Sequence, residues 1–146
     1  MIDTIDAWLR LAAGRIHERA PELTALDQAI GDGDHGTNMD RGFAAIVATL
    51  DGGSPDGDSD VARAAARIRA AGRALISTVG GAAGPLYGTA LVRAAGAVAG
   101  ASDGASSVDA MLDGLEAAIG GISGLGKSSP GEKTMLDALA PALEAG

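Results

Sequence analysis

Hydrophobic residues recur every three or four positions along most of the chain, the spacing that lines one face of a helix. In the first segment, residues 2–19, this stripe consists of Ile2, Ile5, Leu9, Ala12 and Ile16. Proline favours the first turn of a helix, so we expect a second, shorter helix to begin at Pro21 and to end near Gly31. The chain is therefore predicted to open with two helices that meet near residue 20.

Further stretches repeat the same spacing, at about 37–50, 60–78, 85–101, 108–122 and from 132 onward. The segments between them, 51–59, 102–107 and 123–131, are rich in Gly, Ser and Asp and are expected to be surface connections. No stretch alternates apolar and polar residues as a half-buried strand would. The pattern predicts an all-α fold, an antiparallel bundle or barrel of helices in a single domain.

Arginines lie along the helix predicted at 60–78, on or beside the face opposite its apolar stripe. They are Arg63, Arg67, Arg69 and Arg73. Such a row could bind phosphate, but a solvated face that balances nearby acids is the more common arrangement. We therefore expect these side chains to lie in solvent.

Composition narrows the function classes. The 146 residues are 47% hydrophobic but only 2% aromatic, so the core must be built from small aliphatic side chains and its helices can approach closely. A net charge of −8 argues against nucleic acid or an anionic membrane as the main partner, and the lack of cysteine excludes thiolate chemistry. Without a signal-like N-terminus or a spanning segment, a cytoplasmic protein is expected.

The most informative stretch is residues 27–39, D-Q-A-I-G-D-G-D-H-G-T-N-M. It places Asp27, Asp32 and Asp34 among glycines that allow tight turns, and clustered carboxylates favour a bound cation. Oxygen ligands suit magnesium, whereas an EF-hand would need ligands where Gly36 and Phe43 stand. The alternative is that Asp32 and Asp34 only cap the helix that follows.

Two more glycine-rich connections precede helices. Residues 77–89 contain Gly80, Gly81 and Pro85, a turn whose helix N-terminus could bind an anion, although close helix packing also uses glycine. This turn lacks the ending of a P-loop. The connection at 123–131 carries Lys127, which could meet either phosphate or solvent.

Three blocks occur in a characteristic order: L-D-Q-A-I-G-D-G-D-H-G-T-N-M-D-R-G-F, S-T-V-G-G-A-A-G-P-L-Y-G and P-G-E-K-T-M-L-D. Together they resemble the nucleotide-binding L subunit of bacterial dihydroxyacetone kinase. The resemblance implies an all-helical antiparallel barrel that holds ADP or ATP at one end through two magnesium ions. It implies that the metal ligands are Asp27, Asp32 and Asp34, and that the nucleotide is lined by His35, Gly36, Thr37, Asn38, Ala82, Ala83, Gly126 and Met135.

The resemblance also implies a phosphotransferase. The terminal phosphoryl group of the bound nucleotide would pass to dihydroxyacetone on a separate K subunit. No covalent intermediate would form on this chain, so the chain is expected to contribute no catalytic residue. The nucleotide would be rephosphorylated in place by an M subunit of the phosphotransferase system, or ATP would be consumed directly. Neither nucleic acid nor membrane is an expected partner.

The chain departs from the family pattern in two places. The family usually has serine where Ala82 and Ala83 stand, so backbone N–H groups alone would meet the phosphate there. The family also continues with two further helices, so we expect residues 1–146 to form a nucleotide-binding domain that is incomplete at its C-terminus. Two alternatives remain: the nucleotide domain of a fatty-acid-kinase-like enzyme, which usually has threonine in place of His35, and a non-catalytic helical module that binds nucleotide.

Overall fold

A computed structural model describes residues 1–101 and 105–146 of the chain. These residues form helices and no strand, which confirms the all-helical prediction. The helices are α1 Ile2–Gln28, α2 His35–Asp51, α3 Asp60–Thr78, α4 Ala83–Ala99, α5 Ser107–Gly126 and α6 Leu136–Ala145. Of the connection expected at 102–107, residues 102–104 lie outside the described residues, and Ser107 already belongs to α5.

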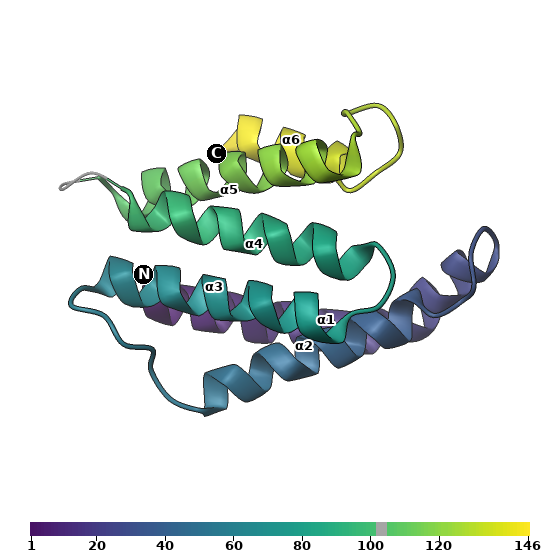
Figure 1. Cartoon of the computed structure of the whole chain (residues 1–146), viewed down its shortest axis with the longest axis horizontal. Coiled ribbons are helices and arrows are strands. Elements are labelled where there is room, and N and C mark those ends of the chain that lie inside the picture. The colour runs from purple at the N-terminus through teal and green to yellow at the C-terminus, as the bar shows by residue number, and fades with distance from the viewer. Residues whose placement is uncertain (102–104) are drawn as a thin grey trace.

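Consecutive helices run antiparallel, so the connections alternate between the two ends of the bundle (Figure 1). The connections 29–34, 79–82 and 127–135 all lie at one end, on the right in Figure 1. The connection 52–59 and the N-terminus lie at the other end. The three connections in which the sequence suggested metal or anion binding therefore lie at the same end of the molecule.

The predicted break near residue 20 is wrong, because α1 continues through Pro21 to Gln28. Proline removes one helical hydrogen bond and crowds the preceding turn. The continuous helix keeps a compensating contact, since the backbone of Ala20 and the side chain of Thr24 lie against Gly36 of α2. A second helix beginning at Pro21 would have lost that packing.

Two boundaries near the C-terminal end also differ from prediction. The segment from Ser123 to Gly126, expected in a connection, continues α5, which ends where Lys127 adopts a left-handed conformation with φ of 51°. The last helix begins at Leu136 rather than Glu132. The preceding residues instead form a turn held by the carboxylate of Asp137, which accepts hydrogen bonds from the N–H groups of Gly131 and Thr134.

The core is built from small aliphatic side chains, as the composition suggested. The largest fully buried side chains are Ile5, Leu9, Ile46, Leu75, Val98, Ile122 and Leu136. Helices α3 and α4 approach through glycine, because a Cβ atom added at Gly72 would lie 2.7 Å from the carbonyl oxygen of Gly88. Such close approach lets short side chains fill the interior.

The expectation that all four arginines of α3 face solvent is wrong for Arg67, whose side chain is 4% exposed. Its guanidinium donates hydrogen bonds to the carbonyl oxygens of Thr49 and Gly53, at 2.9 and 2.8 Å, and to Asp6 Oδ2 at 3.2 Å. Arg67 Nε also lies 2.8 Å from Asp6 Oδ1 as an ion pair, although the two atoms are not aligned as a hydrogen bond. One buried cation thus joins α1, α3 and the end of α2.

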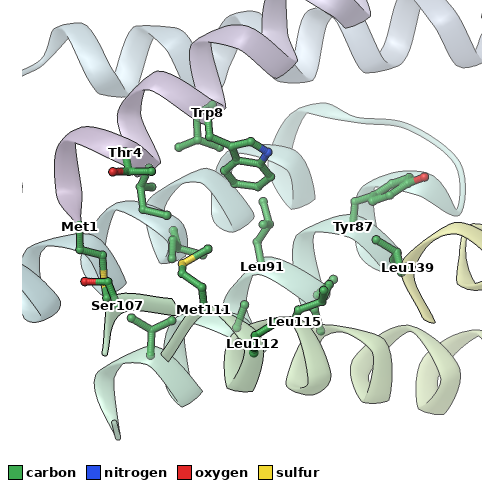
Figure 2. Close-up of a pocket in the computed structure, with 18 of the residues that line it drawn as sticks. Met1, Thr4, Trp8, Tyr87, Leu91, Ser107, Met111, Leu112, Leu115 and Leu139 are labelled. Carbon is green, nitrogen blue, oxygen red and sulfur yellow. The ribbon is translucent and has the colours of Figure 1, made fainter. Parts of the chain in front are cut away.

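An apolar groove of about 810 Å³ runs between α1 and α5, with α3 and α4 beneath it. Figure 2 shows Trp8 of α1 on one side, Met111, Leu112 and Leu115 of α5 on the other, and Tyr87 and Leu91 of α4 between them. Burial here raises the pKa of the Tyr87 phenol.

Among the described helices, none combines the length and the apolar character needed to cross a bilayer.

We expect Arg67→Met to lower the free energy of unfolding by about 3 kcal/mol, because the change leaves Asp6 and two backbone carbonyls without their partner. Urea unfolding followed by circular dichroism measures this. Arg73→Met is the matched control, since Arg73 is an exposed arginine of the same helix and its loss should change stability by less than about 0.5 kcal/mol. Equal effects of the two substitutions would contradict a structural role for the buried guanidinium.

Candidate metal and anion site

Three carboxylates meet at the junction of α1 and α2. Asp27, Asp32 and Asp34 each offer one oxygen atom, and these oxygens lie within 4.8 Å of one another. Asp27 is half-buried near the end of α1, whereas Asp32 and Asp34 are exposed in the turn that follows. The structure therefore brings together the three acids that the sequence singled out.

The backbone of the turn is shaped by Asp27. Its Oδ2 accepts hydrogen bonds from the N–H groups of Asp34, at 2.9 Å, and His35, at 3.2 Å. Glycine is needed at two points, because a Cβ atom at Gly31 would collide with the Asp27 carboxylate and Gly33 adopts a φ of 76°. The glycines thus let the chain fold back so that the later acids face the first.

This arrangement weakens the alternative that the later acids only cap a helix. Asp34 occupies the N-cap of α2, yet its side chain accepts no cap hydrogen bond. The free N–H groups at that helix end are instead taken by Asp27, from the preceding helix. The oxygens of Asp32 and Asp34 remain available, and an all-oxygen donor set of this charge fits a hard divalent cation such as Mg²⁺.

The junction is held by a backbone approach at Gly36. A Cβ atom at this position would collide with the carbonyl oxygen of Ala20 and the hydroxyl of Thr24. Gly36 is buried, while the neighbouring Thr37 is exposed and His35 is half-buried. Gly36 therefore sets the spacing of α1 and α2, and its neighbours offer polar groups beside the acids.

The second glycine-rich turn lies against the same helix. Asn38 is 7% exposed, its N–H donates to the carbonyl oxygen of Asp34, and its Nδ2 would lie 3.3 Å from a Cβ atom at Gly80. Gly81 has a φ of 66°, and α4 begins directly afterwards with Ala82 as its N-cap. Ala82 supplies no side-chain cap, and no other described side chain accepts a hydrogen bond from this helix start, so its first N–H groups are available to an anion.

The third connection lies against the start of α4. A Cβ atom at Gly126 would lie 3.3 Å from a side-chain carbon of Leu86, and Met135 packs in the same apolar cluster as Leu86. Backbone hydrogen bonds from Gly131 and then Thr134 hold the pKa of the Asp137 carboxyl below its usual range. Ala83, Gly126 and Met135 thus lie around the first turns of α4.

The structure therefore places the predicted site residues at one end of the bundle, in two linked groups. Asp27, Asp32, Asp34 and residues 35–38 form the first, and the turn at 79–82 with Gly126 and Met135 forms the second. Sequence reasoning missed Arg41, which contacts Asn38 Oδ1 at 2.7 Å and the carbonyl oxygen of Thr78 at 3.0 Å. Its position three residues after Asn38, on the same helix face, was the available signal.

The sequence of the chain is similar to those of several named proteins. The profile of the DAK2 domain matches residues 29–146. The chain is 40% identical over 94% of its length to the ADP-binding subunit DhaL of PEP-dependent dihydroxyacetone kinase 1 from Listeria innocua, and covers 65% of that protein. It is 35% identical over 94% of its length to the corresponding Escherichia coli subunit, and covers 61% of it.

A solved structure shares the fold. The dihydroxyacetone kinase from C. freundii, crystallised with AMP-PNP and Mg²⁺, superposes with a TM-score of 0.75 at 24% identity. The match covers 99% of this chain and 25% of that one. The present chain thus spans about two thirds, or slightly less, of the subunits it matches and a quarter of the solved kinase.

We expect Gly36→Ala to lower the free energy of unfolding by about 2 kcal/mol or more, because the added methyl group meets backbone atoms that cannot rotate away. Gly120→Ala is the matched control: it lies in the middle of α5, and an added Cβ there has no neighbour within 4 Å. It should stabilise the helix by up to about 1 kcal/mol. Chemical denaturation of both variants measures the difference, and a neutral Gly36→Ala would exclude the close approach.

The turn at 131–134 should loosen in acid. Because the pKa of Asp137 is lowered in the folded protein, its stabilising effect is present above about pH 4 and is lost as the pH falls through the lower, folded-state value. The amide resonances of Gly131 and Thr134 should shift together over that acidic range. In Asp137→Asn the shifts should vanish, whereas unchanged titration in this variant would assign them to another acid.

Proposed function

The chain belongs to the DAK2 domain family, and we propose that it is the nucleotide-binding part of a dihydroxyacetone kinase. In this proposal it holds ADP or ATP through two magnesium ions at the end of the bundle where α1 meets α2. The terminal phosphoryl group would pass to dihydroxyacetone held on a partner K subunit. The nucleotide donor is a cytoplasmic metabolite, so we place the protein in that compartment.

One observation carries the proposal: three carboxylate oxygens lie within 4.8 Å of one another in the turn before α2, at the same end of the bundle as the start of α4, which its N-cap residue does not cap. Carboxylates so close repel unless cations lie among them, and magnesium bound by few carboxylates commonly completes its coordination with phosphate oxygens. The names of the relatives, which are ADP-binding subunits, point to the same class of ligand.

The residues of the chain would act by binding and orientation. Asp27, Asp32 and Asp34 would hold the metal ions, which neutralise phosphate charge and align the phosphoryl group for in-line transfer. Residues 35–38 would meet the nucleotide from one side. Backbone N–H groups at Ala82 and Ala83 would meet it from the other, without the hydroxyl that a serine would supply. Gly126 and Met135 would complete the wall next to α4.

The donor distinguishes two modes of action. In one, ATP is consumed; in the other, ADP stays bound and is rephosphorylated by an M subunit of the phosphotransferase system. We favour the second, because the relatives reported above are named PEP-dependent. In both modes the aspartates supply position and charge, and no covalent intermediate forms on the chain.

We expect the purified chain to bind ADP in the presence of Mg²⁺ and to lose that binding in EDTA, as measured by isothermal titration calorimetry. Asp32→Asn should weaken Mg²⁺-dependent ADP binding about 100-fold, because it removes one of three converging charges. Asp56→Asn is the matched control, an exposed aspartate in the connection at the opposite end of the bundle. Equal affinities in both variants would refute the metal site.

A turnover assay distinguishes a kinase subunit from a non-catalytic module that only binds nucleotide. The chain is mixed with dihydroxyacetone and K subunit, and either ATP or phosphoenolpyruvate with the phosphotransferase-system proteins is added. Product formed only with the M subunit supports the favoured mode, and product formed from ATP alone supports direct consumption. Nucleotide binding without product under either condition would instead identify a non-catalytic module.

A further inference from the structure

We propose that Arg41 is a positioning residue, which fixes the side-chain amide of Asn38 so that its NH₂ group faces the turn at Gly80 and Gly81. Arg41 lies on the first turns of α2, one turn beyond Asn38. Its use in nucleotide binding rests on the proposed function, whereas its control of the amide does not.

The contacts of Arg41 join two helices. Its Nη2 donates to Asn38 Oδ1 at 2.7 Å, and its Nε donates to the carbonyl oxygen of Thr78 at 3.0 Å. Thr78 is the last residue of α3, and the carbonyl groups at a helix end lack partners within the helix. One planar guanidinium therefore holds the start of α2 against the end of α3.

The chemistry of the pair decides which way the amide points. A guanidinium can only donate hydrogen bonds, so the atom of Asn38 that faces it must be the oxygen. The NH₂ group is then turned the other way. The two orientations of the amide are nearly equal in shape, and among the described residues no hydrogen bond to Asn38 Oδ1 other than that of Arg41 selects between them.

The NH₂ group faces the glycine-rich turn. A Cβ atom at Gly80 would lie 3.3 Å from Asn38 Nδ2 and 3.7 Å from Oδ1, so Nδ2 is the nearer of the two amide atoms and a larger residue there would crowd it. Asn38 is 7% exposed, and no acceptor for Nδ2 is found among the described residues, but Nδ2 is not one of the atoms that are closed off from solvent without a partner. The NH₂ group is therefore open to solvent at the face of the turn, where a phosphate oxygen held beside the turn would replace water as its acceptor.

The same contacts connect the acids to the turn. The Asn38 N–H donates to the carbonyl oxygen of Asp34 at 2.9 Å, and the Asn38 side chain reaches Arg41, which in turn holds Thr78. The metal-binding turn and the glycine-rich turn are thereby tied through two side chains. A ligand that bridges metal and turn would meet both in a fixed relation.

The test measures orientation and affinity separately. Arg41→Met removes both donors, Arg41→Lys keeps a cation that can reach Asn38 Oδ1, and Arg73→Met controls for the loss of an exposed arginine outside the site. In ¹⁵N-labelled protein without ligand, we expect one sharp pair of Asn38 side-chain NH₂ resonances in wild type, Arg41→Lys and Arg73→Met. In Arg41→Met this pair should broaden or shift.

Affinity for Mg²⁺-ADP should fall about tenfold in Arg41→Met and recover largely in Arg41→Lys, since one hydrogen bond to a charged group is lost and then restored. Asn38→Ala should show a similar loss. In the Asn38→Ala background, Arg41→Met should have little further effect, because Arg41 acts through the side chain already removed. Mn²⁺ affinity without nucleotide should stay unchanged in all of these variants.

Two results would overturn the proposal: an unchanged Asn38 NH₂ pair in Arg41→Met, or losses of ADP affinity that simply multiply in the double variant. The second would mean that Arg41 ties the helices without acting on Asn38. If wild type binds no Mg²⁺-ADP, the proposed function fails, and the resonances of Asn38 alone still decide whether Arg41 sets the amide.

Discussion

Mutual repulsion among Asp27, Asp32 and Asp34 is the constraint on which the candidate site depends. Two unit charges at about 4 Å cost roughly 1 kcal/mol in water and several times that at lower effective dielectric. The chain holds three such groups with their oxygens within 4.8 Å of one another. The first acid is fixed by backbone N–H groups, and the others sit on a glycine-framed turn. Because the fold holds the three carboxylates together despite their repulsion, a bound cation would relieve that repulsion, and the site favours cations.

The approach of α1 and α2 gives the site its rigidity. Gly36 leaves no room for a side chain against the backbone of Ala20, so the junction of the two helices can adopt little other spacing. The same device recurs at Gly72 and Gly88, where α3 meets α4. A chain with few aromatic residues can bury its backbone closely in this manner, and its loops then project from a firm base. The apolar groove beside Trp8 is the exception, a wide space in an otherwise closely packed bundle.

Arginine serves two different purposes in this acidic protein. Arg67 is buried and satisfies backbone carbonyl groups where α2 ends, so it acts as part of the core. Arg41 is exposed, and its two contacts lie at the other end of α2, beside the acids and the glycine-rich turn. Both use the rigid fork of the guanidinium to hold groups from more than one segment. A lysine would offer a single point of charge in either place.

Sequence periodicity was sufficient to predict the all-α class and the bounds of α3, because an amphipathic stripe shows which face of a helix is buried. Residue type and spacing likewise identified the acids and the glycine-rich turns, since oxygen donors and glycine carry their chemistry locally. Tertiary structure alone decided the rest. The helix continues through Pro21 where Ala20 and Thr24, on either side of it, pack against Gly36 of α2. Arg67 is buried because carbonyl groups distant in sequence converge on it. The orientation of Asn38 depends on Arg41 and Thr78, which three-dimensional packing brings together. The local sequence identifies the chemistry that a side chain offers, whereas the groups that bind and orient it come from segments distant in the sequence.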